Sequence, residues 1–186
     1  MIWLYFNSET DLFSSQGKKM LHIAPEACFV DKLMNHSQID YLSADLTKPA
    51  MVKMDITDIG YPDRSFDVIY CSHVLEHIPD DRRAMKELAR ILRPNGWAIL
   101  QVPLSINQDE TFEDPSITDP KERERLFGQS DHVRVYGKDY KHRLEEAGFI
   151  VENIPYLEKF STEEKHRFGL NIDKDDIYFC MLNSGV

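Results

Sequence analysis

A chain of 186 residues has room for one seven-stranded α/β domain but not for a second full domain. Its 32 acidic and 22 basic residues give a formal net charge of -10, which would repel a phosphate backbone, so we expect no nucleic acid partner. No apolar run approaches the roughly 20 residues that cross a bilayer, and Met1 to Phe6 lacks the basic flank and cleavage site of a signal peptide. We therefore expect a globular, cytoplasmic protein with no membrane span.

Short apolar, β-rich runs alternate with stretches of helical spacing along the chain. This alternation is typical of a mostly parallel sheet covered by helices on both faces, so the predicted fold class is α/β. Seven strands are predicted: Lys19 to Ile23, Ile39 to Ser43, Met51 to Met54, Phe66 to Cys71, Trp97 to Val102, Phe149 to Ile154 and Ile177 to Leu182.

Three helices are predicted between these strands. Val30, Leu33 and Met34 form the apolar face of the first. The second has the clearer periodicity, and we expect it to stop at the turn-forming run Pro94 to Gly96. The third is predicted over Asp139 to Ala147.

The segment Pro103 to Gln129 is too long and too polar to be an ordinary connection. We interpret it as a lid-like insertion, at about residues 103–130 of a single domain that spans residues 1–186. Lys121 to Phe127 follows an Asp-Pro pair, which is a common helix start, so a short helix is predicted there.

The cysteines Cys28, Cys71 and Cys180 are far apart, without the close pairing typical of zinc sites or disulfides, and we expect buried free thiols. His73 and His77 have the i, i+4 spacing that could supply two metal ligands from one helix. No third ligand with suitable spacing is evident, so no metal site is predicted.

Ligands of open α/β sheets bind outside the carboxyl ends of the strands. Asp45 follows the second predicted strand and Asp55 follows the third. An aspartate at the end of the second strand can accept hydrogen bonds from both hydroxyls of a ribose. One after the third strand can accept a hydrogen bond from the amino group of an adenine. Aspartate is also a common loop and cap residue, so a structural role remains the alternative.

The stretch Arg64 to Tyr70, with Val74 to Ile78 and Glu87 to Gly96, resembles the central segment of class I S-adenosylmethionine-dependent methyltransferases. It is most similar to the type 11 methyltransferase domain family, and a weaker correspondence runs from about Lys18 to about Leu182. The resemblance implies a Rossmann-like sheet with strand order 3-2-1-4-5-7-6. It also implies an enzyme that binds S-adenosylmethionine and methylates an acceptor, which we expect to be a small molecule.

The resemblance further implies that the loops after the first four strands hold the cofactor. The cofactor-binding residues would be His22, Ala24, Pro25, Glu26, Asp45, Leu46, Asp55, Ile56, Ser72 and His73. Asp45 would hold the ribose, while Asp55 and the backbone of Ile56 would hold the adenine. Ser72 and His73 would lie near the sulfonium and its methyl group.

The loop after the first strand departs from the family. Relatives have an acidic residue and a Gly-x-Gly-x-Gly pattern where this chain has His22, Ala24, Glu26 and Cys28. Glycines let the backbone approach a ligand without a Cβ, so their absence predicts a different loop path or a weaker, displaced cofactor. Glu26 either binds the ammonium group of the cofactor or is the first-turn acid of the next helix. The alternative function is a non-catalytic, S-adenosylmethionine-binding or regulatory module.

His73 is the first candidate for a general base, because it directly follows the fourth strand; a capping or solvent-bound imidazole is the alternative. Alternation along Asp131 to Gly137 sends His132, Arg134 and Tyr136 to one face. Arg134 and Tyr136 could there bind an anionic substrate, with His132 as the base. A lid anchored by salt bridges is the other interpretation.

The aromatic residues Trp3, Tyr5 and Phe6 lie close before the first strand. We expect them to pack as the remnant of a cofactor-covering helix. Little of the N-terminal substrate cap of relatives would then remain, so part of the acceptor site could be absent or supplied by the partner in a homodimer.

Overall fold

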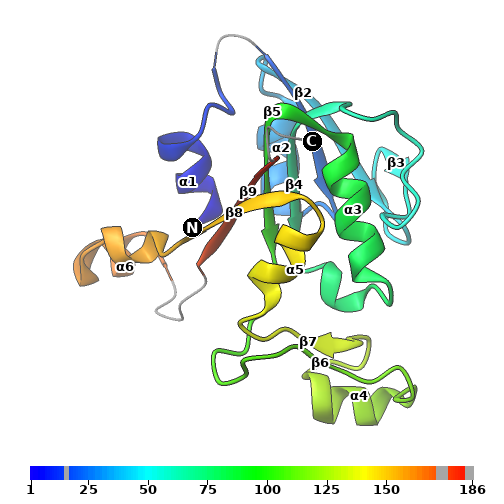
Figure 1. The fold of residues 1–186 in the computed structure, drawn as a ribbon. Helices are drawn as coiled ribbons and strands as arrows, with labels where there is room; N and C mark the ends of the chain where they lie inside the picture. The colour runs from blue at the N-terminus through cyan, green and yellow to red at the C-terminus, as the bar shows by residue number, and fades with distance from the viewer. Residues whose placement is uncertain (15–16, 171–175, 183–186) are drawn as a thin grey trace.

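A seven-stranded sheet of order β3-β2-β1-β4-β5-β9-β8 forms the centre of the computed structural model (Figure 1), which describes residues 1–14, 17–170 and 176–182. Its strands are β1 (Lys18–Ile23), β2 (Ile39–Asp45), β3 (Val52–Lys53), β4 (Phe66–Ser72), β5 (Leu92–Gln101), β8 (Phe149–Ile154) and β9 (Ile177–Leu182). The first five are parallel, and β9 is antiparallel to both neighbours. Because β8 and β9 are the sixth and seventh predicted strands, the expected order is confirmed.

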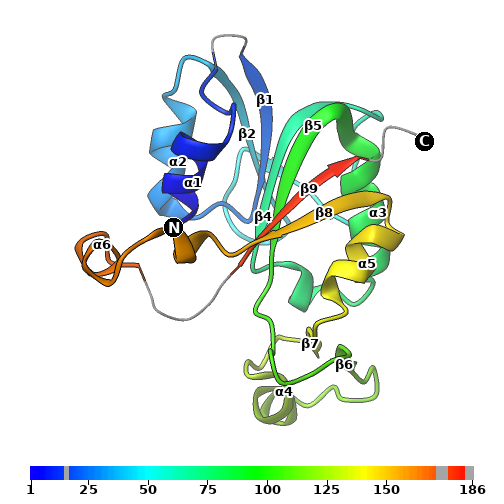
Figure 2. The same cartoon turned by 60° about the vertical axis from the view of Figure 1, so that its left-hand side comes forward.

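Helices cover both faces of the sheet. Figure 2 shows α1 (Ile2–Glu9) and α2 (Ala27–Met34) on one side and α3 (Asp81–Ile91) and α5 (Tyr140–Glu146) on the other. Successive side chains of a strand point to opposite faces, and β4 follows this rule. Val68 and Tyr70 pack in the cluster that contains Phe6 of α1, whereas Ile69 packs in the cluster that contains Leu88 of α3. The predicted α/β class is confirmed.

The orientation of α2 differs from the prediction. Leu33 is fully buried, but Met34 is 49% exposed, because Phe29, one turn before Leu33, points inward and contacts Tyr70. This rotation also leaves Cys28 exposed, so only two of the three cysteines are buried as expected.

Helix α3 ends at Ile91, before the predicted stop at Pro94 to Gly96. The reason is long-range: Leu92 pairs with Phe66, so β5 begins directly after the helix. Gly96 then lies inside the strand, where a Cβ would meet the carbonyl oxygen of Asp67 at 2.5 Å. Glycine is needed there for close strand packing rather than for a helix stop.

The aromatic residues of α1 belong to the core. Phe6 is fully buried, with its ring 5.4 Å from Tyr70 and 6.0 Å from Trp97 between centroids. Tyr5 packs edge-on against Tyr156 of the 3₁₀ helix η2 (Tyr156–Lys159). These contacts lie on the face of the sheet, so α1 serves the core here rather than a cofactor.

The predicted insertion stands off the carboxyl end of β5 (Figures 1 and 2). It contains β6 (Phe112–Glu113), paired antiparallel with β7 (Arg134–Val135), and α4 (Pro120–Phe127), which confirms the short helix expected there. The other helices of the described residues are the 3₁₀ turn η1 (Leu75–His77) and α6 (Thr162–Arg167). Within the described ranges, every helix is too short or too polar to cross a bilayer.

Candidate functional site

A pocket of about 370 Å³ lies at the carboxyl ends of the first four strands. This volume is within the range of about 300 to 1,000 Å³ that is usual for small-molecule sites. Six of the ten predicted cofactor-binding residues line it: Ala24, Asp45, Leu46, Asp55, Ile56 and His73. The structure does not place His22, Pro25, Glu26 or Ser72 in its wall.

Asp45 is held at the end of β2 by its own loop. Its Oδ1 accepts hydrogen bonds from the backbone N–H groups of Thr47 at 2.7 Å and Lys48 at 2.6 Å. Partial burial raises the pKa of the Asp45 carboxyl, but these hydrogen bonds outweigh burial and hold the pKa below its ordinary value. The carboxylate is therefore ionised at neutral pH and oriented before a ligand arrives.

Asp55 repeats this arrangement after β3. Its Oδ1 accepts from both the N–H and the hydroxyl of Thr57, each at 2.8 Å, and these bonds lower the pKa of Asp55. Sequence reasoning missed the threonines, although the repeated pattern Asp-Leu-Thr and Asp-Ile-Thr was visible. Both motifs present an oriented carboxylate to the same pocket.

The loop after β1 is a closed polar network instead of a glycine turn. The Nε2 of buried His22 lies 2.5 Å from Glu26 Oε2, and the Tyr70 hydroxyl donates to Glu26 Oε1 at 2.9 Å. Burial raises the pKa of Glu26, but the bonds from His22 and Tyr70 outweigh it and keep the pKa below its ordinary value. Glu26 makes no side-chain cap to α2, and an ammonium group would have to share its carboxylate with His22 and Tyr70.

Two pocket residues have a strained backbone. Ala24 has φ 48° and His73 has φ 55°, in the left-handed region that L-residues seldom adopt. They follow the adjacent strands β1 and β4 and line the same pocket. Such strain is often stored at functional sites. Ala24 thus keeps the conformation that favours glycine at a place where the family has glycine.

His73 and His132, the two predicted bases, differ in position. The side chain of His73 is 59% exposed, and its Nδ1 lies 3.5 Å from Oε1 of buried Glu76. His132 is buried, with its Nδ1 3.1 Å from the Phe127 carbonyl oxygen. It does not line the pocket; His77, which contacts it edge-on, does.

Arg134 and Tyr136, the predicted substrate-binding residues, are buried outside the pocket wall. The guanidinium of Arg134 donates to the carbonyl oxygens of Leu75 and Pro79, each at 2.9 Å. The Tyr136 hydroxyl donates to Asp81 Oδ2 at 2.7 Å. As expected from the alternation, both face the same side as His132. Their contacts match the other interpretation of this segment, a lid anchored by salt bridges.

The pocket also contains residues that sequence reasoning did not assign to it. Thr47, Lys48, Val74, Ile78 and Asp131 line it. Thr47, Lys48 and Val74 lie within two residues of predicted site residues, whereas Ile78 directly follows η1. Asp131 comes from the segment before β7, and only the tertiary structure brings it to the strand ends.

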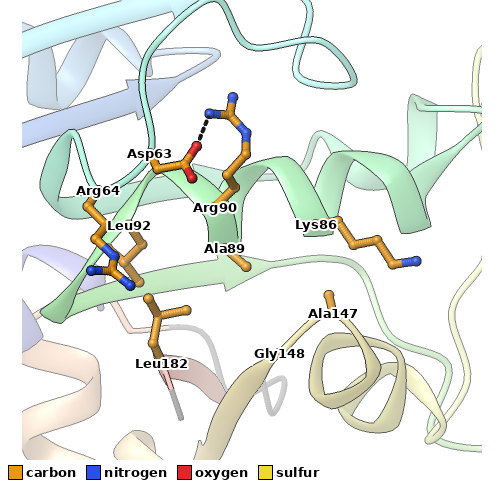
Figure 3. A pocket seen from close by; sticks show the side chains of 9 residues that line it. All are labelled: Asp63, Arg64, Lys86, Ala89, Arg90, Leu92, Ala147, Gly148 and Leu182. Carbon is orange, nitrogen blue, oxygen red and sulfur yellow. Dashed lines mark hydrogen bonds and ion pairs between the residues drawn. The ribbon is translucent and has the colours of Figure 1, made fainter. Parts of the chain in front are cut away.

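A second cavity, of about 330 Å³, lies between α3 and the turn that joins α5 to β8 (Figure 3). Its wall includes Arg64 and Lys86, while Arg90 is paired with Asp63 at 2.8 Å. Arg64 precedes β4, so this cavity is at the amino end of that strand. Ligands of α/β sheets bind at the carboxyl ends, which favours the pocket of Asp45 and Asp55 as the candidate site.

Comparison with known proteins identifies the family of this chain. The model of a methyltransferase domain family matches residues 16–154, and the chain belongs to that family. It is 30% identical over 118 residues to 27-O-demethylrifamycin SV methyltransferase of Amycolatopsis mediterranei, covering 61% of this chain and 42% of that protein. It is 23% identical over 157 residues to sterol 24-C-methyltransferase of Yarrowia lipolytica, covering 76% and 39%. The chain therefore spans less than half the length of these relatives.

Solved structures show the same fold at low sequence identity. An S-adenosylmethionine dependent methyltransferase from Mesorhizobium loti matches with a TM-score of 0.59 at 16% identity, covering 88% of this chain and 90% of that one. The [4+2]-cyclase SpnF matches with a TM-score of 0.58 at 13% identity, covering 94% and 80%. Since the fold also carries a cyclase, the fold alone does not define the reaction.

Proposed function

We propose that this domain binds S-adenosylmethionine in the pocket at the carboxyl ends of β1 to β4 and transfers its methyl group to a small-molecule acceptor. The observation that carries the proposal is the pair of ionised, pre-oriented carboxylates, Asp45 and Asp55, in one pocket. Membership of the methyltransferase domain family supports it.

The residues present fit the nucleoside part of this cofactor. Asp45 would accept hydrogen bonds from the ribose hydroxyls, and Asp55 would accept from the adenine amino group, with apolar Ile56 beside it. The small side chain of Ala24 lets the β1 loop approach the ligand. When bound, the cofactor supplies a methyl carbon activated by a sulfonium leaving group.

His73 is the proposed general base. It lines the pocket at the end of β4, and Glu76 faces its Nδ1. Its task would be to accept a proton from an acceptor that must lose one during attack. Positioning of the acceptor would supply most of the acceleration.

We further propose that residues 103–130 are a lid-like insertion of one domain that spans residues 1–186. The insertion lies at the end of the sheet that carries the pocket (Figure 1). Asp131, which directly follows it, lines the pocket. The acceptor would therefore approach between this segment and the strand ends.

Calorimetry with S-adenosylmethionine and S-adenosylhomocysteine tests the binding step. We expect Asp45→Ala to weaken binding by about 1 to 3 kcal/mol, the usual loss for a hydrogen bond to a charged group. Asp40→Ala, at an exposed position of the same strand, is the matched control and should bind like the wild type. The proposal fails if the wild type gives neither heat nor a thermal shift at millimolar ligand; NAD should give neither.

The catalytic step requires an acceptor, found by screening small hydroxylated, aminated and lipid-linked metabolites with methyl-labelled cofactor. His73→Ala should then reduce turnover by roughly 10²-fold while cofactor affinity stays unchanged. His142→Ala, at an exposed histidine of α5, is the control. Equal loss of binding and turnover would assign His73 a structural role.

A non-catalytic S-adenosylmethionine-binding module is the second candidate. The observation that favours it is the network of His22, Glu26 and Tyr70, which replaces the glycine loop of relatives. Tight cofactor binding without turnover of any acceptor in the screen would support this alternative.

A further inference from the structure

Three potential metal ligands meet beside the pocket. Glu76, His77 and His132 each offer one ligand atom, and these atoms all lie within 4.8 Å of one another. Glu76 and His77 belong to η1, whereas His132 comes from the segment before β7. In the sequence, His73 and His77 had the spacing of two metal ligands. In the structure, His77 lies instead beside Glu76 and His132.

Two of the polar atoms in this cluster have no hydrogen-bond partner among the described residues: Glu76 Oε2 and His132 Nε2. Glu76 is 2% exposed and His132 is 5% exposed, so water does not readily replace the missing partners. A buried carboxylate oxygen without a partner is costly. Because His132 Nδ1 faces the Phe127 carbonyl oxygen, Nδ1 carries the proton in the neutral ring and Nε2 is an acceptor. Two buried acceptors thus lack a donor, and a cation would satisfy both.

The surroundings of the histidines fit the same interpretation. His77 Nδ1 lies 3.4 Å from Asp131 Oδ2, and His132 Nδ1 lies 3.1 Å from a backbone carbonyl oxygen. Histidines that bind metals almost always donate their other N–H to such a group. In both rings Nε2 is then the nitrogen available to a metal.

The two segments that carry the ligands are also fixed to each other. The N–H of Val133 donates to the Glu76 carbonyl oxygen at 2.9 Å, and Arg134 donates to the carbonyl oxygens of Leu75, at the start of η1, and of Pro79, two residues after it. The ligands therefore need little reorganisation to bind an ion.

We propose that Glu76, His77 and His132 form a binding site for one divalent transition metal ion, with zinc as the preferred ion. Two imidazoles and one carboxylate are the protein ligands of zinc sites that keep an open coordination position. His77 and Asp131 line the pocket, so the site borders the space of an acceptor. A hydroxyl bound there would lose its proton more easily. The metal site itself does not depend on the proposed methyl transfer.

Metal titration of the tag-free, chelator-treated protein tests the site. We expect one zinc ion per chain by calorimetry, an increase in melting temperature, and, with cobalt as a substitute, the visible absorption of a histidine-ligated ion. Cys28 is an exposed thiol that could bind zinc by itself, so the titration is repeated on Cys28→Ser, which should bind zinc equally.

Four variants assign the binding to this cluster. Glu76→Gln and His132→Gln should each weaken zinc binding by roughly tenfold or more, and Asp131→Asn, which changes only the support of His77, by about 10-fold to 100-fold. His142→Gln, at an exposed histidine on α5, should bind zinc like the wild type.

Absence of stoichiometric zinc binding at micromolar metal would overturn the proposal, as would equal affinity in Glu76→Gln and His132→Gln. If those two variants fail to fold, Asp131→Asn decides, because Asp131 is exposed and its replacement leaves the core unchanged. Unchanged zinc affinity in this folded variant would then count against the site.

Discussion

Two buried polar clusters lie within a few residues of each other near β7, and they differ in how well their atoms are paired. In the first, Arg134 and Arg143 bind Asp81 and Glu113, and Tyr136 adds a hydrogen bond to Asp81. In the second, Glu76 Oε2 and His132 Nε2 have no partner among the described residues.

This difference distinguishes a cluster that supports the fold from a cluster that could bind a ligand. A paired buried network contributes to a unique structure and fails strongly when one member is removed. An unpaired buried group costs stability and persists where something else, such as a ligand, offsets that cost. Arg134 and His132 are two residues apart on one face, yet we expect opposite results when their clusters are altered.

The largest expected effect is that of Arg134→Met. The substitution removes a buried guanidinium that binds Asp81, Glu113 and the carbonyl oxygens of Leu75 and Pro79, so the free energy of unfolding should fall by about 3 to 5 kcal/mol. Urea unfolding measures this loss. Arg82→Met removes an ion pair that is about half exposed and should cost about 1 kcal/mol or less. Similar losses in the two variants would contradict the comparison.

Tyr136→Phe should have the next largest effect. The lost hydrogen bond goes to the buried carboxylate of Asp81, so we expect a loss of about 1.5 to 3 kcal/mol in unfolding free energy. Burial, with the charge of Asp81, raises the pKa of Tyr136, which remains neutral and can donate. Tyr140→Phe is the matched control, because the Tyr140 hydroxyl donates to the neutral Leu100 carbonyl oxygen. This substitution should lower the free energy of unfolding by about 1 kcal/mol. A reversed order would show that Asp81 does not depend on Tyr136.

Glu76→Gln should behave in the opposite way in metal-free protein. It removes a buried charge with one unpaired oxygen, so the free energy of unfolding should stay the same or rise by about 1 kcal/mol. With zinc present the wild type should become the more stable of the two. Chemical denaturation with and without zinc checks both statements, and a clear loss of stability in the metal-free variant would mean that Glu76 is already satisfied.

The smallest effect concerns the paired network of Glu26 with His22 and Tyr70. Because the folded pKa of Glu26 lies below its ordinary value, its ionised form stabilises the fold above the unfolded pKa. That stability is lost as pH falls through the folded pKa. The stability difference between wild type and Glu26→Gln should therefore be greatest near neutral pH and shrink in acid. Urea unfolding between about pH 3 and pH 7 measures it, with Glu158→Gln as an exposed control; a pH-independent difference would argue against an ionised Glu26.

Local pattern alone determined the α/β class, the seven strands, and the two aspartates at the end of β2 and shortly after β3. These features depend on the two-residue period of strands and on which residue follows a strand, and both are properties of adjacent residues. For the same reason the alternation of His132, Arg134 and Tyr136 was correctly predicted from the sequence.

Only the tertiary structure decided what those side chains contact. The end of α3 depended on the pairing of Leu92 with Phe66, and Glu26 was engaged by Tyr70 from another strand. The meeting of His77 with His132 likewise joins distant parts of the chain. Such contacts leave no periodicity in either segment, because they arise when the folded sheet brings its strand ends and insertion together.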